Sequence, residues 1–232
     1  MITFIIPTLN EINNIDFTVN KIKSLFSINE EYEIIFVDDK SEDGTLQKIQ
    51  LLSQENNNIR FYVPENRLGL GNALLVGQKK AKGNFIFFLD CDNSINSDDL
   101  SNLINAKDPK SLVIGSRYIK NSKINGVSLL KIFFSRLLNF FVSFYLKIPA
   151  KDISHSCRIF PNSETLITEN YKHPIFFWEH SLLYTKRKFK IVEVPIIFDE
   201  RTSGKTKNSF FALFKNVFFS IRSIINLKFK YK

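Results

Sequence analysis

Cysteine is scarce in this chain, with only Cys91 and Cys157 among 232 residues. Two cysteines cannot build the multiple disulfides that stabilise small secreted domains, and such scarcity is typical of the reducing cytoplasm. The N-terminus also lacks the basic segment and long apolar core of a signal peptide, because a strand-like apolar run begins at Ile2. We therefore expect a cytoplasmic protein.

Long apolar runs are missing as well. Residues 127–148 are rich in Phe and Leu, but Lys131, Arg136 and Lys147 interrupt them. The longest uncharged stretch, residues 137–146, has about half the length that a transmembrane helix needs. We expect that this segment does not cross a bilayer. Repeats and low-complexity linkers are also lacking, and 44% hydrophobic content suits one folded domain with a full core.

Acidic residues are absent from residues 201–232, which carry eight Lys or Arg. The first 200 residues account for only +1 of the net charge of +9. Such a basic segment fits an anionic partner, which is a membrane surface, a phosphate-bearing substrate or nucleic acid.

Apolar strand patterns alternate with amphipathic helix patterns along the first 90 residues. Strands are predicted at residues 2–7, 33–37, 59–63 and 85–89, and helices at residues 14–26, 45–53 and 71–81. This alternation predicts an α/β fold with a mostly parallel sheet, in which ligands bind beyond the carboxyl ends of the strands. Three polar clusters, at residues 7–11, 38–39 and 90–92, should therefore converge on one crevice.

Two of these clusters contain paired carboxylates. Asp90 and Asp92 follow an apolar strand, and two carboxylates one residue apart can bind a hard cation beside a phosphate. The alternative is a solvated turn. For Asp38 and Asp39 the alternative is a turn that caps a helix, because acids favour helix N-termini.

A glycine-rich segment at residues 66–71 precedes the third predicted helix. It does not match the dinucleotide-binding fingerprint, since Leu74 stands where the third glycine is needed and the loop is not the first in the chain. With Arg67 beside it, the segment either borders a nucleotide or sugar or forms a tight turn before a packed helix.

Ten short motifs occur in one order along residues 1–210. They are PTLNE (7–11), VDDKSEDGT (37–45), NRLGLGNA (66–73), DCD (90–92), GSRY (115–118), KD (151–152), SCRIF (156–160), FWE (177–179), VEVPI (192–196) and RTSGKTK (201–207). This series closely resembles the family 2 glycosyltransferases, and within them the polyprenyl-phosphate (dolichol-phosphate) mannose synthase branch.

The resemblance implies a GT-A fold, a nucleotide-diphospho-sugar transferase fold with helices on both faces of the sheet. Residues 1–207 would form this domain, with residues 127–148 as a Phe-rich amphipathic insertion and residues 208–232 as a basic amphipathic helix and tail. It also implies Mg²⁺ or Mn²⁺ held by Asp90 and Asp92. Ser94 stands where relatives place a metal-binding Gln and is the candidate third ligand.

The site residues follow from the same resemblance. Contacts to the nucleotide-sugar are implied for Pro7, Leu9, Glu11, Val37, Asp39, Asp90, Cys91, Asp92 and Lys207. Catalytic roles are implied for Asp92, Arg117, Arg201 and Glu179. Ordinary surface charge is the alternative for Arg117, Arg201 and Lys207, and a salt bridge or helix cap is the alternative for Glu179. Leu9 replaces a common Tyr, and Cys157 replaces a common Gly.

The implied reaction is inverting transfer of a sugar, mannose or glucose, from a GDP- or UDP-sugar to a polyprenyl or dolichyl phosphate at the cytoplasmic membrane surface. An acceptor phosphate is already ionised at pH 7, so it needs no strong general base. The alternatives are a family 2 enzyme that uses a sugar hydroxyl in cell-surface polysaccharide synthesis, a nucleotidylyltransferase and a non-catalytic nucleotide-sugar-binding relative. A nucleic-acid-binding module is disfavoured, because the paired carboxylates would repel a phosphate backbone.

A helix is predicted over residues 208–227, with Phe211, Phe214 and Phe218 on one face and Lys215 and Arg222 on the other. A basic, Phe-rich amphipathic helix fits the plane of a membrane surface, so we expect a peripheral location on the inner face. The alternatives are packing on the protein core or in a dimer interface, the latter making a homo-oligomer.

Overall fold

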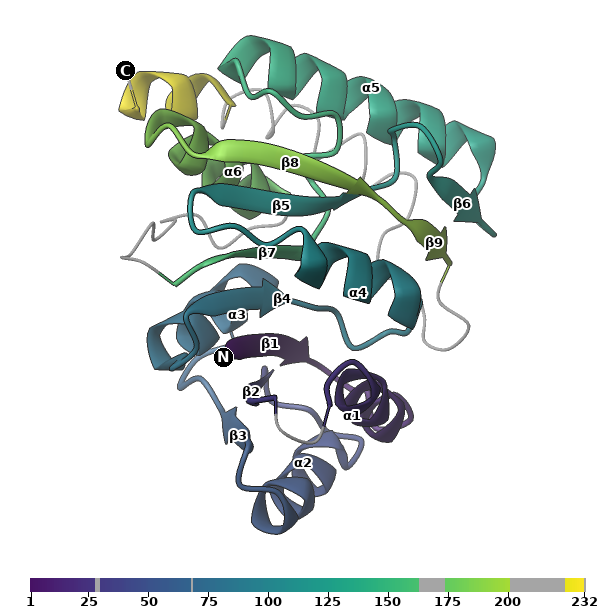
Figure 1. Cartoon of the computed structure of the whole chain (residues 1–232), viewed down its shortest axis with the longest axis vertical. Coiled ribbons are helices and arrows are strands. Elements are labelled where there is room, and N and C mark those ends of the chain that lie inside the picture. Colours follow the sequence, from purple (N-terminus) through teal and green to yellow (C-terminus); the bar gives the residue numbers. More distant parts are fainter. Residues whose placement is uncertain (28–29, 68, 163–173, 201–223, 232) are drawn as a thin grey trace.

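The computed structural model describes residues 1–27, 30–67, 69–162, 174–200 and 224–231. A seven-stranded sheet runs through the centre of the molecule, and helices cover both of its faces (Figure 1). Arg201, Lys207 and residues 208–223 of the predicted C-terminal helix lie outside the described residues.

The elements follow the chain in this order: β1 (Ile2–Thr8), α1 (Ile15–Ser24), β2 (Tyr32–Asp38), α2 (Thr45–Glu55), β3 (Ile59–Tyr62), α3 (Leu70–Lys80), β4 (Phe85–Phe88), α4 (Ser97–Asn105), β5 (Ser111–Ser116), β6 (Lys123–Asn125), α5 (Leu129–Leu146), β7 (Arg158–Pro161), α6 (Ile175–Lys186), β8 (Lys190–Pro195) and β9 (Ile197–Asp199). Residues 224–230 are also helical. The strands and helices predicted up to residue 89 are confirmed, each within about two residues at its ends.

The strand order in the sheet is β3-β2-β1-β4-β7-β5-β8. The pairs β1 with β2, β1 with β4, β2 with β3 and β5 with β8 are parallel, whereas β7 is antiparallel to both of its neighbours. The mostly parallel sheet is therefore as predicted. Because β1, β2 and β4 are parallel neighbours, the segments that follow them leave the sheet at one edge.

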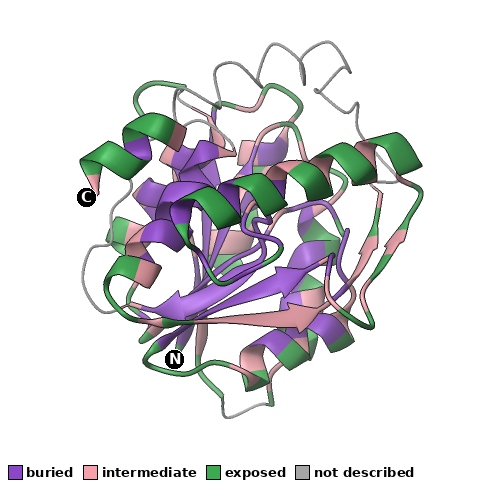
Figure 2. Ribbon diagram, turned by 90° about the horizontal axis from the view of Figure 1, so that it is seen from above, coloured by how far each residue is buried: buried purple, intermediate pink, exposed green. Residues whose placement is uncertain are grey.

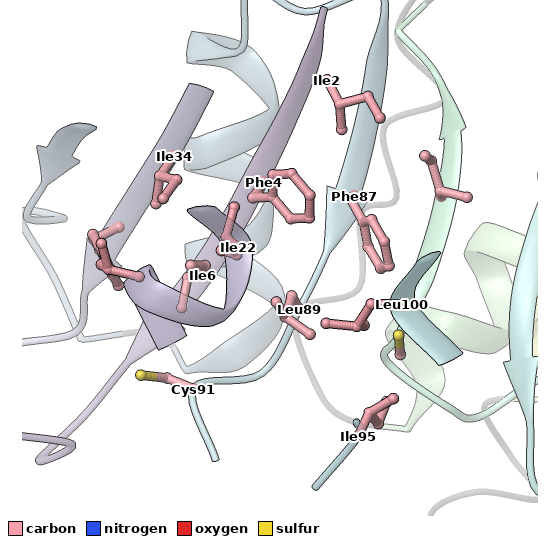
Figure 3. Close-up of a cluster of buried hydrophobic side chains, with 14 of the residues drawn as sticks. Ile2, Phe4, Ile6, Ile22, Ile34, Phe87, Leu89, Cys91, Ile95 and Leu100 are labelled. Atoms are coloured by element: carbon pink, nitrogen blue, oxygen red, sulfur yellow. The ribbon is translucent and has the colours of Figure 1, made fainter. Parts of the chain in front are cut away.

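Each face of the sheet is buried under its own helices. On one face, Phe4, Phe36 and Phe87 pack with residues of α1, α2 and α4 in a single apolar cluster (Figure 3). On the other face, Ile5, Ile35 and Phe88 pack with residues of α3 and α6. The alternation of core side chains along each strand follows from the period of two in a β-strand.

A third apolar cluster lies outside the sheet. It joins Val142 and Leu146 of α5 to Trp178 and Leu182 of α6 and to Leu227 near the C-terminus. For the described residues 224–231, packing on the protein is thus the arrangement that the structure shows. Helix α5 has 18 residues with a mean hydropathy of 1.5, enough in length and composition for a membrane span, and 22% of it is buried.

Candidate active site

The three polar clusters predicted to converge follow β1, β2 and β4, which are parallel and end at the same edge of the sheet. The Thr8 hydroxyl donates to Asp38 at 3.2 Å, and the backbone N–H of Asp39 donates to the Thr8 carbonyl at 2.9 Å. The segment after β1 is held in turn by Ser41 and Thr45, which accept the backbone N–H groups of Asn10 and Glu11 at 2.8 Å each.

The carboxylates of Asp38 and Asp39 have different hydrogen-bond partners. Asp38 accepts the backbone N–H of Ser41 at 2.8 Å and so closes the turn after β2. Asp39 is 5% exposed, its Oδ2 accepts the N–H of Gly69 at 3.2 Å, and its Oδ1 has no hydrogen-bond partner among the described residues. The Gly69 backbone has φ of +83°, a conformation that glycine adopts without strain. A buried carboxylate oxygen without a partner is costly, so Asp39 is suited to accept a hydrogen bond from a ligand.

Asp90 and Asp92 lie just beyond β4 and are oriented by their neighbours. The Ser156 hydroxyl donates to Oδ2 of Asp90, and the Ser94 backbone N–H donates to Oδ1 of Asp92 at 3.1 Å. Two oriented carboxylates fit a hard divalent cation, whose remaining ligands are supplied by phosphate oxygens and water. No group of three or more His, Cys, Asp or Glu placed to hold a metal occurs among the described residues.

Helix α1 anchors the segment that follows Asp92. The Lys21 ammonium donates to Asn93 and, at 2.6 Å, to the carbonyl of Ile95. Burial lowers the pKa of Lys21, while the nearby charge of Asp92 acts in the opposite direction. Lys21, Asp90, Asp92 and Ser94 line the same small depression in the surface.

The side chain of Cys91 points away from the crevice. Its sulfur lies 3.4 Å from the Thr18 hydroxyl, within the apolar cluster that Figure 3 shows. Burial raises the pKa of Cys91 to about 12, so the thiol stays protonated. Contact between Cys91 and a nucleotide-sugar would therefore involve its backbone. The same holds for Val37, whose side chain is fully buried in the core.

Arg117 is engaged by a buried carboxylate. Its Nε and Nη2 donate to the two carboxylate oxygens of Asp152 at 2.8 and 2.9 Å, and its backbone N–H donates to the same group at 3.0 Å. Burial alone would raise the pKa of Asp152, but the Arg117 charge outweighs burial and holds this pKa below its usual value. The edge of the guanidinium that carries Nε and Nη2 is therefore occupied by Asp152. Nη1 donates no hydrogen bond within the part of the chain that the structure describes.

Residues 151–157 form a loop, here named the hub loop, that connects several parts of the site. Besides Asp152 and Ser156, it contains Ser154, which exchanges hydrogen bonds of 3.0 Å with Asn139 of α5. Glu193 of β8 accepts the backbone N–H groups at the start of the loop. The hub loop therefore links Asp90, Arg117 and α5.

Arg158, the first residue of β7, fixes the conformation of the hub loop through hydrogen bonds to its backbone. Its fully buried guanidinium donates to the carbonyls of Ile153 at 3.1 Å and His155 at 3.2 Å, and to the Ser181 hydroxyl at 3.2 Å. It also lies 4.6 Å from the centre of the Phe177 ring. Burial lowers the pKa of Arg158 to about 9. The charge is stabilised by carbonyl dipoles and an aromatic face.

Glu179 is fully buried on α6 and accepts hydrogen bonds from Tyr231 at 2.7 Å and Lys230 at 3.1 Å. These contacts match the salt-bridge alternative and fasten the C-terminal residues to α6. Among the other predicted residues, Pro7 pairs in register with Val37, and Leu9 and Glu11 follow β1 at the crevice. Arg201 and Lys207 lie outside the described residues.

Sequence reasoning gave no role to Lys21, Asp152, Ser156 or Arg158. Asp152, Ser156 and Arg158 did stand within the ordered motifs, which was a usable signal. Lys21 carried no signal, because a lysine on the exposed side of an amphipathic helix is the ordinary case.

Comparison with known proteins agrees with this geometry. The family model for glycosyl transferase family 2 matches residues 3–163. A dolichol-phosphate mannosyltransferase of Pyrococcus furiosus is 30% identical over 213 residues, which cover 89% of this chain and 58% of that protein. A polyprenol monophosphomannose synthase of Mycolicibacterium smegmatis is 28% identical over 88% of this chain and 80% of its own length. The chain thus spans little more than half of the Pyrococcus relative.

Solved structures show the same fold at low identity. Glucosyl-3-phosphoglycerate synthase from Mycobacterium tuberculosis, in complex with Mn²⁺, UDP-glucose and phosphoglyceric acid, superposes with a TM-score of 0.65 at 16% identity, covering 98% of this chain and 79% of its own. A mannosyltransferase from Pyrobaculum calidifontis, in complex with GDP-mannose and Mn²⁺, gives 0.56 at 16% identity, covering 88% and 57%. The GT-A fold is confirmed, and the chain belongs to glycosyl transferase family 2.

Proposed function

We propose that this enzyme transfers a hexose, mannose or glucose, from a GDP- or UDP-sugar to a polyprenyl phosphate at the cytoplasmic face of a membrane, with inversion at the anomeric carbon. The observation that carries the proposal is the shared sheet edge, where the oriented pair Asp90 and Asp92 follows β4 and Asp39 follows β2. Oδ1 of Asp39 has no hydrogen-bond partner among the described residues. A nucleoside diphosphate presents both the N–H donors and the diphosphate that these groups require.

The donor would lie across the crevice from β2 to β4. Oδ1 of Asp39 would accept an N–H of the base, because both guanine and uracil carry such donors. Pro7, Leu9 and Glu11 would border the nucleoside. Asp90 and Asp92 would hold Mg²⁺ or Mn²⁺ with the diphosphate. The backbone N–H of Ser94 would orient the Asp92 carboxylate. When bound, the metal ion neutralises charge that develops on the departing diphosphate.

In this proposal, cationic side chains bind the acceptor phosphate. In the proposed step an acceptor phosphate oxygen forms a bond to the anomeric carbon, while the bond from that carbon to the donor diphosphate breaks and the nucleoside diphosphate leaves. Nη1 of Arg117 would orient the acceptor phosphate, with Arg201 and Lys207 as further phosphate contacts. Asp152 holds Arg117 in place, so the guanidinium needs no reorganisation before the reaction.

The names of the relatives support this acceptor. A dolichol-phosphate mannosyltransferase and a polyprenol monophosphomannose synthase both align with nearly nine-tenths of the chain. The mannosyltransferase structure with GDP-mannose and Mn²⁺ supports the donor and metal class.

The test is transfer from radiolabelled GDP- and UDP-sugars to a short polyprenyl phosphate, with Mg²⁺, Mn²⁺ or EDTA. We expect a metal-dependent product that extracts into organic solvent, and loss of that product in Arg201→Ala with little change in thermal stability. A water-soluble glycoside from a sugar acceptor would favour the sugar-hydroxyl alternative. Folded protein that gives no product with any donor would favour a non-catalytic relative.

A further inference from the structure

Helix α5 exposes an apolar face. Its inner face, including Asn139, Val142 and Leu146, is buried against the protein. The outer face, which an ordinary surface helix fills with polar residues, is mainly Phe and Leu. Its most exposed apolar residues are Leu129 (83%), Leu130 (63%), Phe133 (58%), Phe140 (61%), Phe141 (57%) and Phe144 (77%). In Figure 2, seen from above, the turns of this long helix are largely exposed.

The surroundings of the C-terminal half of this face are basic, whereas near its N-terminal end Lys131 pairs with Glu200 at 3.5 Å. No Asp or Glu occurs between Asp108 and Asp152, a stretch that includes the whole of α5. A groove of about 790 Å³ runs beside the C-terminal half of the helix. Its wall combines Phe140, Phe144 and Tyr145 with four cationic side chains, those of Arg136, Lys147, Lys151 and Lys228. Apolar side chains next to a ring of cations match the layered chemistry of an anionic bilayer surface, acyl chains below and phosphates above.

We propose that the outer face of α5 docks on an anionic lipid bilayer, with the helix axis in the plane of the membrane and the groove cations on the lipid phosphates. The choice of a bilayer as the partner rests on the proposed function, in which the acceptor is a lipid. Charge complementarity favours this occupant over a second copy of the chain, because two copies would bring the same cations together.

The in-plane orientation follows from the contacts of the inner face. Asn139 is 1% exposed and exchanges two hydrogen bonds with Ser154. Val142 and Leu146 pack against Trp178 and Leu182. A helix that crossed the bilayer would have to break these contacts, although its length and composition suffice for a span. A helix that lies flat keeps all of them.

Docking by this face also positions the active site. The hydroxyl of Tyr118 donates to Ser135 of α5 at 2.7 Å, and Arg136 donates to the carbonyl of Tyr118 at 3.4 Å. Tyr118 follows Arg117 directly and lines the groove. The guanidinium that would meet the acceptor phosphate is therefore next to the surface on which that phosphate is displayed.

The first test is flotation of the full chain with vesicles of phosphatidylcholine alone or mixed with phosphatidylglycerol, without donor or acceptor. We expect binding to the anionic vesicles, and at least about a tenfold loss of it in a Phe140→Ser, Phe141→Ser, Phe144→Ser variant. A Phe17→Ser, Leu51→Ser variant is the matched control, because both side chains are exposed, 48% and 58%, but lie on α1 and α2. Thermal unfolding verifies that both variants fold.

Equal binding by the wild type and the α5 variant would overturn the proposal, as would a concentration-dependent dimer that buries α5 without any vesicle binding. The flotation test contains no substrate, so its result is independent of the transfer assay. Vesicle binding can persist when no sugar is transferred, and sugar can be transferred when the protein binds no vesicles.

Charge and orientation are tested separately. Replacing Lys147, Lys151 and Lys228 with Gln should weaken binding to anionic vesicles by about fivefold for each cation and leave phosphatidylcholine binding unchanged. A Trp at position 141 (Phe141→Trp) should be quenched by lipids brominated near the headgroup, and alkaline carbonate should release the protein. Quenching that is strongest at the bilayer centre, with resistance to carbonate, would overturn the in-plane orientation.

Discussion

The Ser156 hydroxyl donates a hydrogen bond to Oδ2 of Asp90 and so joins two loops whose residues are 66 positions apart. The contact gives Asp90 an orientation that does not depend on a bound metal. Arg158 donates hydrogen bonds to the carbonyls of Ile153 and His155, and His155 directly precedes Ser156. The Ser156 hydroxyl is therefore itself held in place.

Removing this hydroxyl should weaken metal binding. In Ser156→Ala we expect Mn²⁺ affinity to fall by about 10- to 100-fold, as for other outer groups that orient metal ligands. Titration of Mn²⁺ by electron paramagnetic resonance, in the presence of a nucleoside diphosphate, measures this directly. Ser156→Thr should restore most of the affinity, and Ser53→Ala, on α2, is the control. Unchanged affinity in Ser156→Ala would show that Asp90 needs no such support.

The pair of Arg117 and Asp152 should stabilise the fold as well as position the guanidinium. Asp152 is fully buried, so Arg117→Met leaves an unpaired buried carboxylate and should lower the free energy of unfolding by about 3–5 kcal/mol. Urea unfolding at neutral pH is the measurement. The control is Lys48→Met, which breaks an exposed pair with Asp16 and should cost less than about 1 kcal/mol.

A double variant separates packing from charge. Adding Asp152→Leu to Arg117→Met removes the unpaired carboxylate and should recover part of the lost stability. If the single and double variants unfold alike, desolvation of Asp152 is not the cause.

Asp39 should determine donor affinity with little effect on stability. Asp39→Asn keeps the shape but replaces the ionised acceptor, and a hydrogen bond to a charged group is worth about 1.5–3 kcal/mol, so the Kd for a nucleoside diphosphate should rise at least about tenfold. Calorimetric titration of UDP and GDP without metal measures the change. Asp16→Asn, at an exposed position on α1, should leave the Kd unchanged. The assignment fails if both variants bind like the wild type.

Much of the fold was predictable because its causes are local. The strands up to Phe88 are short apolar runs and the helices between them have a clear apolar period, so β1, β2 and β4 were placed together with the residues that follow them. Asp39 and the pair of Asp90 and Asp92 lie at the same edge of the sheet for that reason. The antiparallel insertion of β7 was not predicted, since nothing in a four-residue apolar run specifies its direction.

The polar network was harder to predict than the crevice. Arg158 looks like an ordinary charged residue in the sequence, yet it is fully buried, and only the chain path shows which carbonyls surround it. The partners of Arg117 and Asp90 lie 35 and 66 positions away, distances over which residue patterns carry no pairing information. The Phe-rich composition of residues 127–148 indicated an amphipathic helix, but which face is exposed depends on α6 and the hub loop.

Buried neutral histidine should make the protein sensitive to mild acid. His155 is 6% exposed, and burial, together with the charges of Arg117 and Arg158, lowers its pKa to about 3, against the weaker opposing influence of Asp152 and Asp92. The unfolded chain takes up a proton on this residue below about pH 6.5, whereas the folded protein does so only near pH 3. Stability is therefore lost as pH falls through this window, by up to about 1.4 kcal/mol per pH unit.

His155→Asn removes this contribution, so its free energy of unfolding should fall less steeply than that of the wild type between about pH 6.5 and pH 5. Urea unfolding at several pH values within that range gives both slopes. His180 is also buried, and its pKa is lowered well below the usual value by burial and then by Arg158, so His180→Asn should flatten the slope in the same sense. Parallel slopes for all three proteins would mean that these histidines are protonated in the folded state, which is incompatible with their burial beside Arg158.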